Sequence, residues 1–213
     1  SSDSPVSKRL KVREVLAGEM LHALGVPTSR ALSLFETGES LERSDEPSPT
    51  RASVLVRLSH GHIRFGTFER LAFHRDRVGM TRLMDYCVEH FFPSIADERE
   101  RPMALMRAII AQCVELAAAW MVTGFVHGVL NTDNMNVTGE SFDYGPWRFV
   151  PRYDEDFVAA SFDHKGVYAY GRQHMAVLWN LTRFAEALGL LAPEAAVADH
   201  LYGYMPAYQR AYR

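Results

Sequence analysis

The feature that most constrains this fold is a long apolar segment between Pro102 and Val122. Proline suits the first turn of a helix, where its missing amide proton has no partner to lose, and Gly124 follows where helices commonly end. Apolar side chains recur through the segment at intervals of three and four residues: Met106, Ile109, Ile110, Cys113, Ala117, Trp120 and Met121. This spacing predicts a buried helix around which the rest of the chain packs.

The segments on either side of this helix predict a mixed architecture. Upstream, a helical pattern covers residues 9–24, and short strands are expected over 31–35 and 53–58 with a polar loop, 38–50, between them. Further helices are expected over 77–91, 172–188 and 193–212. The order of elements indicates an α+β fold that is mostly helical.

Charge and cysteine usage narrow the classes of protein to which the chain can belong. A formal net charge of −3 over 213 residues offers no basic surface for nucleic acid or an anionic membrane. Cys87 and Cys113 lie in apolar helical patterns without a C-x-x-C neighbour, which predicts buried free thiols in a reducing compartment. No apolar run approaches the ~18 residues of a membrane span, and the start lacks a signal-peptide core. We therefore expect a soluble, intracellular protein.

Polar residues gather directly after the long helix. The segment His127-Gly-Val-Leu-Asn-Thr-Asp-Asn-Met contains Asn131, Asp133 and Asn134, and Asp143 follows in an Asp-Tyr-Gly turn. An amide and a carboxylate followed by a second carboxylate supply the oxygen ligands that hold Mg²⁺ on a nucleotide, as in protein kinases. The alternative is an Asx-rich turn whose side chains bond only to their own backbone. The position behind a long buried helix favours a site.

Charged residues upstream are candidates for binding phosphate. Arg57 and Arg64 stand seven residues apart in a strand-to-loop segment, and guanidinium groups bind phosphate bidentately. Glu14 lies on the first predicted helix, where a glutamate orients a phosphate-binding lysine in kinases. The alternatives are solvated arginines at a sheet edge and a surface carboxylate. His60 and His62 share one face of a predicted strand but lack a third ligand, so we reject a zinc site.

Several strings of residues occur in a characteristic order and spacing along essentially the whole chain. They are Arg13-Glu14, His22-Ala-Leu-Gly-Val-Pro-Thr-Ser-Arg-Ala-Leu-Ser33, His62-Ile-Arg-Phe-Gly-Thr-Phe68, Gly124-Phe-Val-His-Gly-Val-Leu-Asn-Thr-Asp-Asn-Met135, Phe142-Asp-Tyr-Gly-Pro146 and the segment from Gln173 to Asn180. In this combination they resemble the selenoprotein O family of protein adenylyltransferases.

The resemblance implies a protein-kinase-like fold, with a partial small lobe over residues 1–66 and a helical large lobe over 67–213 that carries a catalytic loop, 126–146. It also implies an enzyme that binds ATP in an inverted pose and transfers AMP to Ser, Thr or Tyr hydroxyls of proteins. The implied partners are ATP and protein substrates, with Mg²⁺ as the metal or Mn²⁺ in its place. Nucleic acid and membrane partners are not expected, and the oligomeric state stays open. The implied location is the bacterial cytoplasm, or the mitochondrion for a eukaryotic source.

The family's catalytic roles fall on the polar loop. By position, the resemblance makes Asp133 the acceptor of the hydroxyl proton. It makes Asn134 and Asp143 the metal ligands, with Asp143 also meeting the nucleotide phosphates. Attack at the α-phosphorus develops charge on its oxygens and on the leaving pyrophosphate, which Mg²⁺ and arginines stabilise.

The family's nucleotide-binding roles fall on the first part of the chain. By position, Arg57 and Arg64 contact ATP, and Glu14 positions the ATP-binding lysine. Asp3 stands where the family has the aspartate of an Asp-Gly pair near the nucleotide, and Ser4 replaces that glycine.

Departures from the family pattern leave alternatives open. The family's glycine-rich loop and ATP-binding lysine fall upstream of Glu14, and its C-terminal redox residue is not matched. The stretch from Ser161 to Tyr168 also differs from the family's usual histidine-serine-aspartate and glycine-arginine-tyrosine pattern. We therefore expect either a fragment of a longer protein or a reduced homologue. The alternatives to adenylyl transfer are a degenerate pseudokinase that binds nucleotide or partners without turnover, and a kinase that transfers phosphate.

Overall fold

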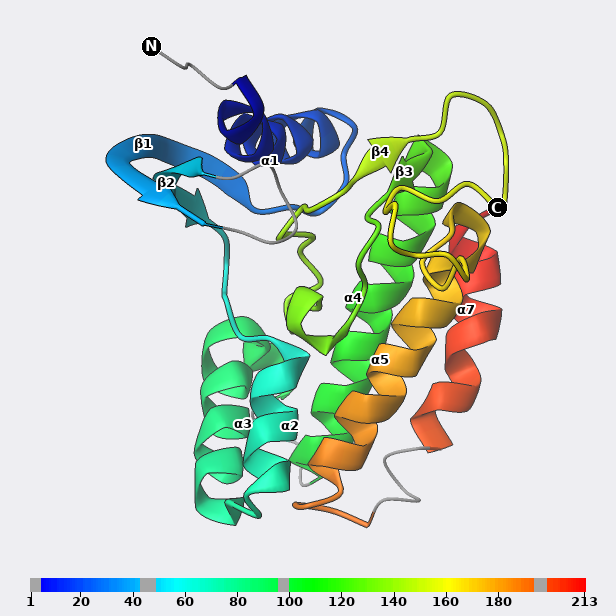
Figure 1. The fold of residues 1–213 in the computed structure, drawn as a ribbon. Coiled ribbons are helices and arrows are strands. Elements are labelled where there is room, and N and C mark those ends of the chain that lie inside the picture. The colour runs from blue at the N-terminus through cyan, green and yellow to red at the C-terminus, as the bar shows by residue number, and fades with distance from the viewer. Residues whose placement is uncertain (1–4, 43–48, 96–99, 194–198) are drawn as a thin grey trace.

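The computed structural model of the chain describes residues 5–42, 49–95, 100–193 and 199–213 (Figure 1). Helices dominate these residues, as predicted for a mostly helical α+β fold. The helices are α1 (Pro5–Ala23), α2 (Phe65–Phe73), α3 (Arg77–Phe91), α4 (Arg101–Thr123), α5 (Gln173–Leu188) and α7 (Tyr204–Ala211). The strands are β1 (Arg30–Leu41), β2 (Thr50–Leu58), β3 (Phe125–Val126) and β4 (Arg148–Phe149). Short 3-10 turns are η1 (Pro93–Ile95), η2 (Thr132–Asn134), η3 (Tyr170–Arg172) and η4 (Asp199–Gly203).

Helix α4 forms the centre of the molecule. Every apolar side chain that the periodicity predicted to be buried in it is buried, and Gly124 ends the helix in the left-handed conformation with φ 70°. By length and composition alone, α4 is apolar enough to cross a membrane, but most of it is covered by the rest of the fold. Its position as the core helix accounts for that composition.

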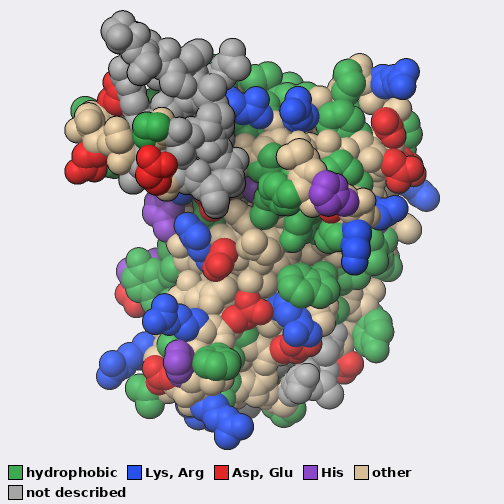
Figure 2. Space-filling view, in the orientation of Figure 1, with side chains coloured by type: hydrophobic (Ala, Val, Ile, Leu, Met, Phe, Trp, Pro, Cys, Tyr) green, Lys and Arg blue, Asp and Glu red, His purple; other side chains and the backbone are tan. Residues whose placement is uncertain are grey.

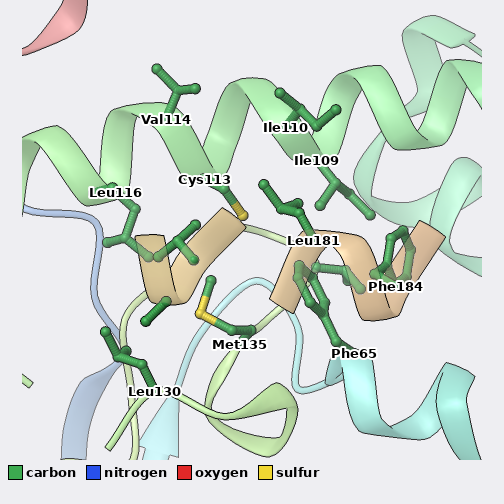
Figure 3. Close-up of a cluster of buried hydrophobic side chains, with 14 of the residues drawn as sticks. Phe65, Ile109, Ile110, Cys113, Val114, Leu116, Leu130, Met135, Leu181 and Phe184 are labelled. Carbon is green, nitrogen blue, oxygen red and sulfur yellow. The ribbon is translucent and has the colours of Figure 1, made fainter. Parts of the chain in front are cut away.

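The core under α4 also fixes the polar loop that follows it. Leu181 and Phe184 of α5 pack below α4, and Met135 of the loop reaches into the same cluster (Figure 3). Phe65, the first residue of α2, joins this cluster, with its ring centroid 4.7 Å from that of Phe184. Full burial of such a side chain stabilises the fold by roughly 1.5–3 kcal/mol. Met135 and Phe65 therefore act as apolar anchors beside the polar residues next to them.

The hairpin β1–β2 and helix α1 form a second, smaller body above α2 and α3 and beside the upper part of α4 (Figure 1). The two strands pair antiparallel, with Arg30 opposite Leu58 and Phe35 opposite Val54. Ala17 and Leu21 of α1 are fully buried, and a Cβ on Gly18 would stand 2.9 Å from the carbonyl oxygen of Ser29. This close approach seats α1 on the segment that leads into the hairpin.

Some elements differ from the sequence predictions. Helix α2 was not predicted, because it is short and, among its residues, Phe65 and Phe68 alone are buried. Both strands of the hairpin are longer than predicted, since backbone pairing continues through the polar residues near the turn. The helix predicted over 193–212 includes residues 194–198, which lie outside the described residues. Over 199–213 the prediction is wrong in extent, because the 3-10 turn η4 precedes α7 and the α-helix begins at Tyr204.

Cys87 and Cys113 are free and buried, as predicted, and burial raises the pKa of each thiol to about 12. On the described part of the face in Figure 2, acidic, basic and apolar side chains are interspersed. This mixed surface agrees with a net charge near zero.

Candidate active site

The polar loop is closed at its base by a small ladder. Phe125 of β3 pairs with Phe149 of β4, and Val126 pairs with Arg148, so the chain between them leaves the end of α4 and returns to it. Val150 donates its amide proton to the carbonyl oxygen of Gly124 and extends this closure. Residues 127–147 are therefore held as one loop at the end of the core helix.

A buried polar cluster fixes the start of this loop. The amide of His127 donates to Oε1 of Gln173 over 2.9 Å, and Nε2 of His127 donates to the carbonyl oxygen of Phe142 over 2.9 Å. Gln173 also donates to the carbonyl oxygen of Phe125, and Asn180 donates to that of Leu130. Burial lowers the pKa of His127, which keeps the ring neutral. His127 is thus a structural link between the two halves of the loop.

Asp133 lies in the 3-10 turn η2, whose N-terminus is capped by the side chain of Asn131. Oδ1 of Asn131 accepts the amide proton of Asp133 over 2.9 Å. The side chain of Asn131 therefore forms the Asx turn that the sequence offered as the alternative to a site. Asp133 itself is exposed, and its carboxylate lies against Gly66 in the first turn of α2. Thr132 donates a hydrogen bond to Glu69 of the same helix. The turn therefore presents the Asp133 carboxylate at the surface beside α2.

Asn134 and Asp143 are brought together although nine residues separate them. Nδ2 of Asn134 lies 3.2 Å from Oδ2 of Asp143, and both side chains are partly buried. Asp143 has a φ of 62°, a left-handed conformation that aspartate tolerates better than most residues and that recurs at functional sites. The Asp-Tyr-Gly turn thus directs a carboxylate toward the amide of Asn134.

This pair fits a metal that is shared with a nucleotide. Magnesium is commonly held by one or two protein oxygens, with phosphate oxygens and water completing the octahedron. The described residues contain no group of three or more His, Cys, Asp or Glu side chains that would form an all-protein cage. In the structure the amide nitrogen of Asn134 faces Asp143. With the amide turned so that its oxygen faces the same way, Asn134 and Asp143 could hold such a metal through two oxygen atoms.

Glu14 and Arg57 form a largely buried ion pair beside this turn. Nη1 of Arg57 lies 2.9 Å from Oε1 of Glu14, and the two side chains are 22% and 16% exposed. Burial raises the pKa of Glu14 to about 7, against the influence of Arg57 and of a hydrogen bond from the amide of Tyr144; the charge of Asp143 raises it further. The alternatives of a surface glutamate and a solvated Arg57 are therefore wrong.

Arg64 approaches the same turn from the start of α2. It is the residue before the helix, and it bridges to Asn136 of the polar loop. The guanidinium carbons of Arg57 and Arg64 lie 5.5 Å and 5.2 Å from the centroid of the Phe142 ring. The two arginines, one on β2 and one before α2, thus converge on the residue that precedes Asp143.

Two sequence expectations fall outside this arrangement. Asp3 lies outside the described residues. The prediction that His60 and His62 share one face of a strand is wrong, because both follow the end of β2, where the ladder with β1 stops at Leu58. His60 instead contacts Glu140, with its Nδ1 2.9 Å from Oε1.

Three residues that contribute to the site were missed from the sequence. Gly66 gives Asp133 its space, Phe142 contacts both arginines, and Gln173 bonds to the start of the loop. Each makes contacts with residues far away in the chain, so no local pattern marks its role. The only available signal was that each falls inside a string shared with the selenoprotein O family.

Known proteins match the chain along nearly all of its length. The family model described as protein adenylyltransferase SelO matches residues 2–213. A protein nucleotidyltransferase YdiU from Synechocystis sp. is 50% identical over 200 residues, which cover 92% of this chain and 42% of that protein. A protein of the same name from Trichodesmium erythraeum is 43% identical over 221 residues, covering 100% of this chain and 47% of the relative.

The chain thus spans less than half the length of these relatives. Within that span, the match includes the strings that build the polar loop, the Asp-Tyr-Gly turn and the two arginines around it. With both the sequence match and the converging polar residues in agreement, the chain belongs to the SelO family of protein adenylyltransferases.

Proposed function

We propose that this chain carries the metal–nucleotide site of a protein adenylyltransferase, which transfers AMP from ATP to Ser, Thr or Tyr hydroxyls of proteins. The observation that carries the proposal is the contact between Asn134 and Asp143, with Arg57 and Arg64 converging on the residue before Asp143. Two oxygen ligands beside two guanidinium groups match the charge of a magnesium–triphosphate complex. Manganese suits the same oxygen ligands.

The proposed role of Asn134 and Asp143 is to hold the metal against the phosphates of ATP. When bound, Mg²⁺ neutralises charge on the phosphate oxygens and orients them. Arg57 and Arg64 bind the phosphate chain and stabilise the negative charge that develops as pyrophosphate leaves. Asp143 is fixed for this task by its backbone conformation, and Arg57 is fixed by Glu14.

Asp133 is proposed as the general base. In the transfer, the acceptor oxygen forms a bond to the α-phosphorus while the bond from that phosphorus to the bridging oxygen of pyrophosphate breaks. The hydroxyl proton passes to the Asp133 carboxylate, which is exposed and therefore accessible to a protein acceptor. Asn134, the proposed metal ligand, is the next residue in the same 3-10 turn, which supports a base and a metal ligand that act side by side.

The proposed fold for this chemistry is protein-kinase-like. Residues 1–66 correspond to part of the small lobe, with α1 and the hairpin, and residues 67–213 correspond to the helical large lobe with the catalytic loop 126–146. Glu14 on α1 takes the place of the helix glutamate of kinases; among the described side chains, its partner is Arg57. We also propose protein acceptors and the bacterial cytoplasm, because the relatives named above are bacterial proteins that are called protein nucleotidyltransferases.

The test is an incubation of the chain with Mg²⁺, a generic protein acceptor and ATP labelled at either the α- or the γ-phosphate. Adenylyl transfer predicts protein labelling from α-labelled ATP alone, lost in Asp143→Asn and retained in Asp85→Asn. Asp85 is a suitable control because it is an exposed aspartate paired with Arg101 on the helical lobe. Labelling from γ-labelled ATP alone would identify a phosphoryl-transferring kinase instead. Binding of ATP without transfer of either label would identify a pseudokinase.

A further inference from the structure

The side chain of Phe142 contacts both of the arginines that are proposed to bind phosphate. The two guanidinium carbons lie 5.5 Å and 5.2 Å from its ring centroid, within the ~6 Å range of a cation–π interaction. The ring is only 3% exposed, so it is held in one place by its surroundings. A single buried aromatic side chain thus forms a common support for two cationic groups from different elements.

The backbone on either side of the ring is also fixed. The amide of Ser141 donates to the carbonyl oxygen of Pro27 over 2.9 Å, and the carbonyl oxygen of Ser141 accepts from Ser29 over 3.0 Å. The carbonyl oxygen of Phe142 accepts from Nε2 of His127, as described above. Because these bonds hold both ends of the residue, the ring is a rigid surface against which flexible arginines can be ordered.

The two arginines depend on this ring to different degrees. Arg57 is also held by its ion pair with Glu14. Within the described part of the chain, Arg64 has no carboxylate partner. Its backbone bridges to Asn136 and accepts from the amide of Thr67, and its guanidinium lies over the Phe142 ring. The position of the Arg64 guanidinium therefore rests mainly on Phe142, and its positive charge is available to an anion.

We propose that Phe142 is a positioning residue, which orients Arg57 and, above all, Arg64 toward the phosphate chain of ATP. The proposal rests on the proposed function, since it assigns the phosphates as the anion that the arginines meet. Two guanidinium groups repel each other, and the negative face of an aromatic ring offsets this repulsion. The ring also restricts the rotamers of long side chains before ligand binding, so less entropy is lost when phosphate binds.

This role requires an aromatic ring and not only apolar volume. Phe142→Leu retains an apolar side chain of similar size but removes the ring face. We expect the variant to bind Mg²⁺–ATP about tenfold more weakly, which is the order of one or two desolvated cation–π contacts. Its affinity for adenosine, which lacks phosphates, is expected to be unchanged. Phe142→Met provides a second non-aromatic variant if the leucine side chain packs poorly.

The experiment is calorimetric titration of the full chain and its variants with Mg²⁺–ATP and, separately, with adenosine. Phe142→Leu is expected to weaken ATP binding much less in the Arg64→Ala background than in the unmodified chain, because the ring acts mainly through Arg64 and only in small part through Arg57. Arg57→Ala combined with Phe142→Leu is expected to bind more weakly than Arg57→Ala alone.

Equal affinities of Phe142→Leu, Phe142→Met and the unmodified chain for ATP would overturn the proposal. An equal loss of affinity for adenosine in the Phe142 variants would also overturn it, because that loss would indicate a general structural defect. The absence of ATP binding by the unmodified chain would overturn it as well. If the unmodified chain binds ATP and the phosphate-specific loss is found, the proposal stands even where no α-label is transferred. That combination would refute only the transfer reaction.

Discussion

Replacing Gly66 by alanine tests whether the position of Asp133 matters for catalysis. Gly66 lies in the first turn of α2, and a Cβ at this position would stand 2.2 Å from Oδ1 of Asp133. The next atoms in its path are Cγ of Asp133 at 3.2 Å and Oγ1 of Thr132 at 3.7 Å. The added methyl group therefore collides with the end of one exposed side chain and hardly with anything else.

The structure sets the size of the effect. An ordinary contact between a methyl carbon and an oxygen is about 3.4 Å, so the carboxylate must move by roughly 1 Å or rotate away. A displacement of about 1 Å at a reacting group costs on the order of 100-fold in rate. Stability is expected to change little or to rise by up to about 1 kcal/mol, because alanine favours a helix more than glycine does.

The assay compares adenylyl transfer at saturating ATP with the midpoint of thermal unfolding, for Gly66→Ala and for Gly203→Ala. Gly203 is a control for the added methyl group, since a Cβ there meets no atom within 4 Å and the residue lies before α7, outside the polar loop. We expect Gly66→Ala to lose about two orders of magnitude in turnover while its unfolding midpoint is retained. Full activity in a folded Gly66→Ala variant would refute the assignment of Asp133 as the base.

Three further predictions follow from buried groups. Burial raises the pKa of Glu14 from 4.5 to about 7, so between these pH values the folded chain keeps a proton that the unfolded chain releases. The free energy of unfolding, measured in urea, should therefore fall as the pH rises from 4.5 to about 7, and Glu14→Gln should make this fall smaller. Gln173→Leu should destabilise the chain by about 1–3 kcal/mol in the same assay, because it leaves buried backbone groups unpaired. In the native state, Cys87 and Cys113 should resist alkylation at neutral pH and react only on unfolding, since burial raises both thiol pKa values to about 12.

The central helix could be predicted from the sequence because its signal is local. Apolar residues at helical spacing between Pro102 and Gly124 identify both the extent of α4 and its buried side chains. The short helix α2 lacks such a signal: it has nine residues and owes its position to the packing of Phe65 and Phe68 on Phe184 of α5. Contacts of this kind depend on segments more than one hundred residues apart.

The residue types of the site could be predicted, but their partners could not. Asn134 and Asp143 stand out as oxygen ligands in the sequence, and the loop between them brings them together. The pairing of Glu14 with Arg57 could not be foreseen, because it depends on how α1 is seated against the hairpin. The contacts of Phe142 with Arg57 and Arg64 could not be foreseen either, because they join residues far apart in the chain. In the sequence, an apolar residue before an Asp-Tyr-Gly turn indicates only a core position.

Binding of Mn²⁺ shows whether Asn134 and Asp143 form one metal site for ATP. Electron paramagnetic resonance would follow free Mn²⁺ during titration of the chain in the presence and absence of ATP. We predict ATP-dependent binding by the unmodified chain and by the control Asp85→Asn, and binding weakened by more than about tenfold in Asn134→Ala and in Asp143→Asn. Asparagine tolerates the left-handed backbone at position 143, so that variant should remain folded. Unchanged Mn²⁺–ATP binding in both site variants would show that Asn134 and Asp143 do not hold the metal.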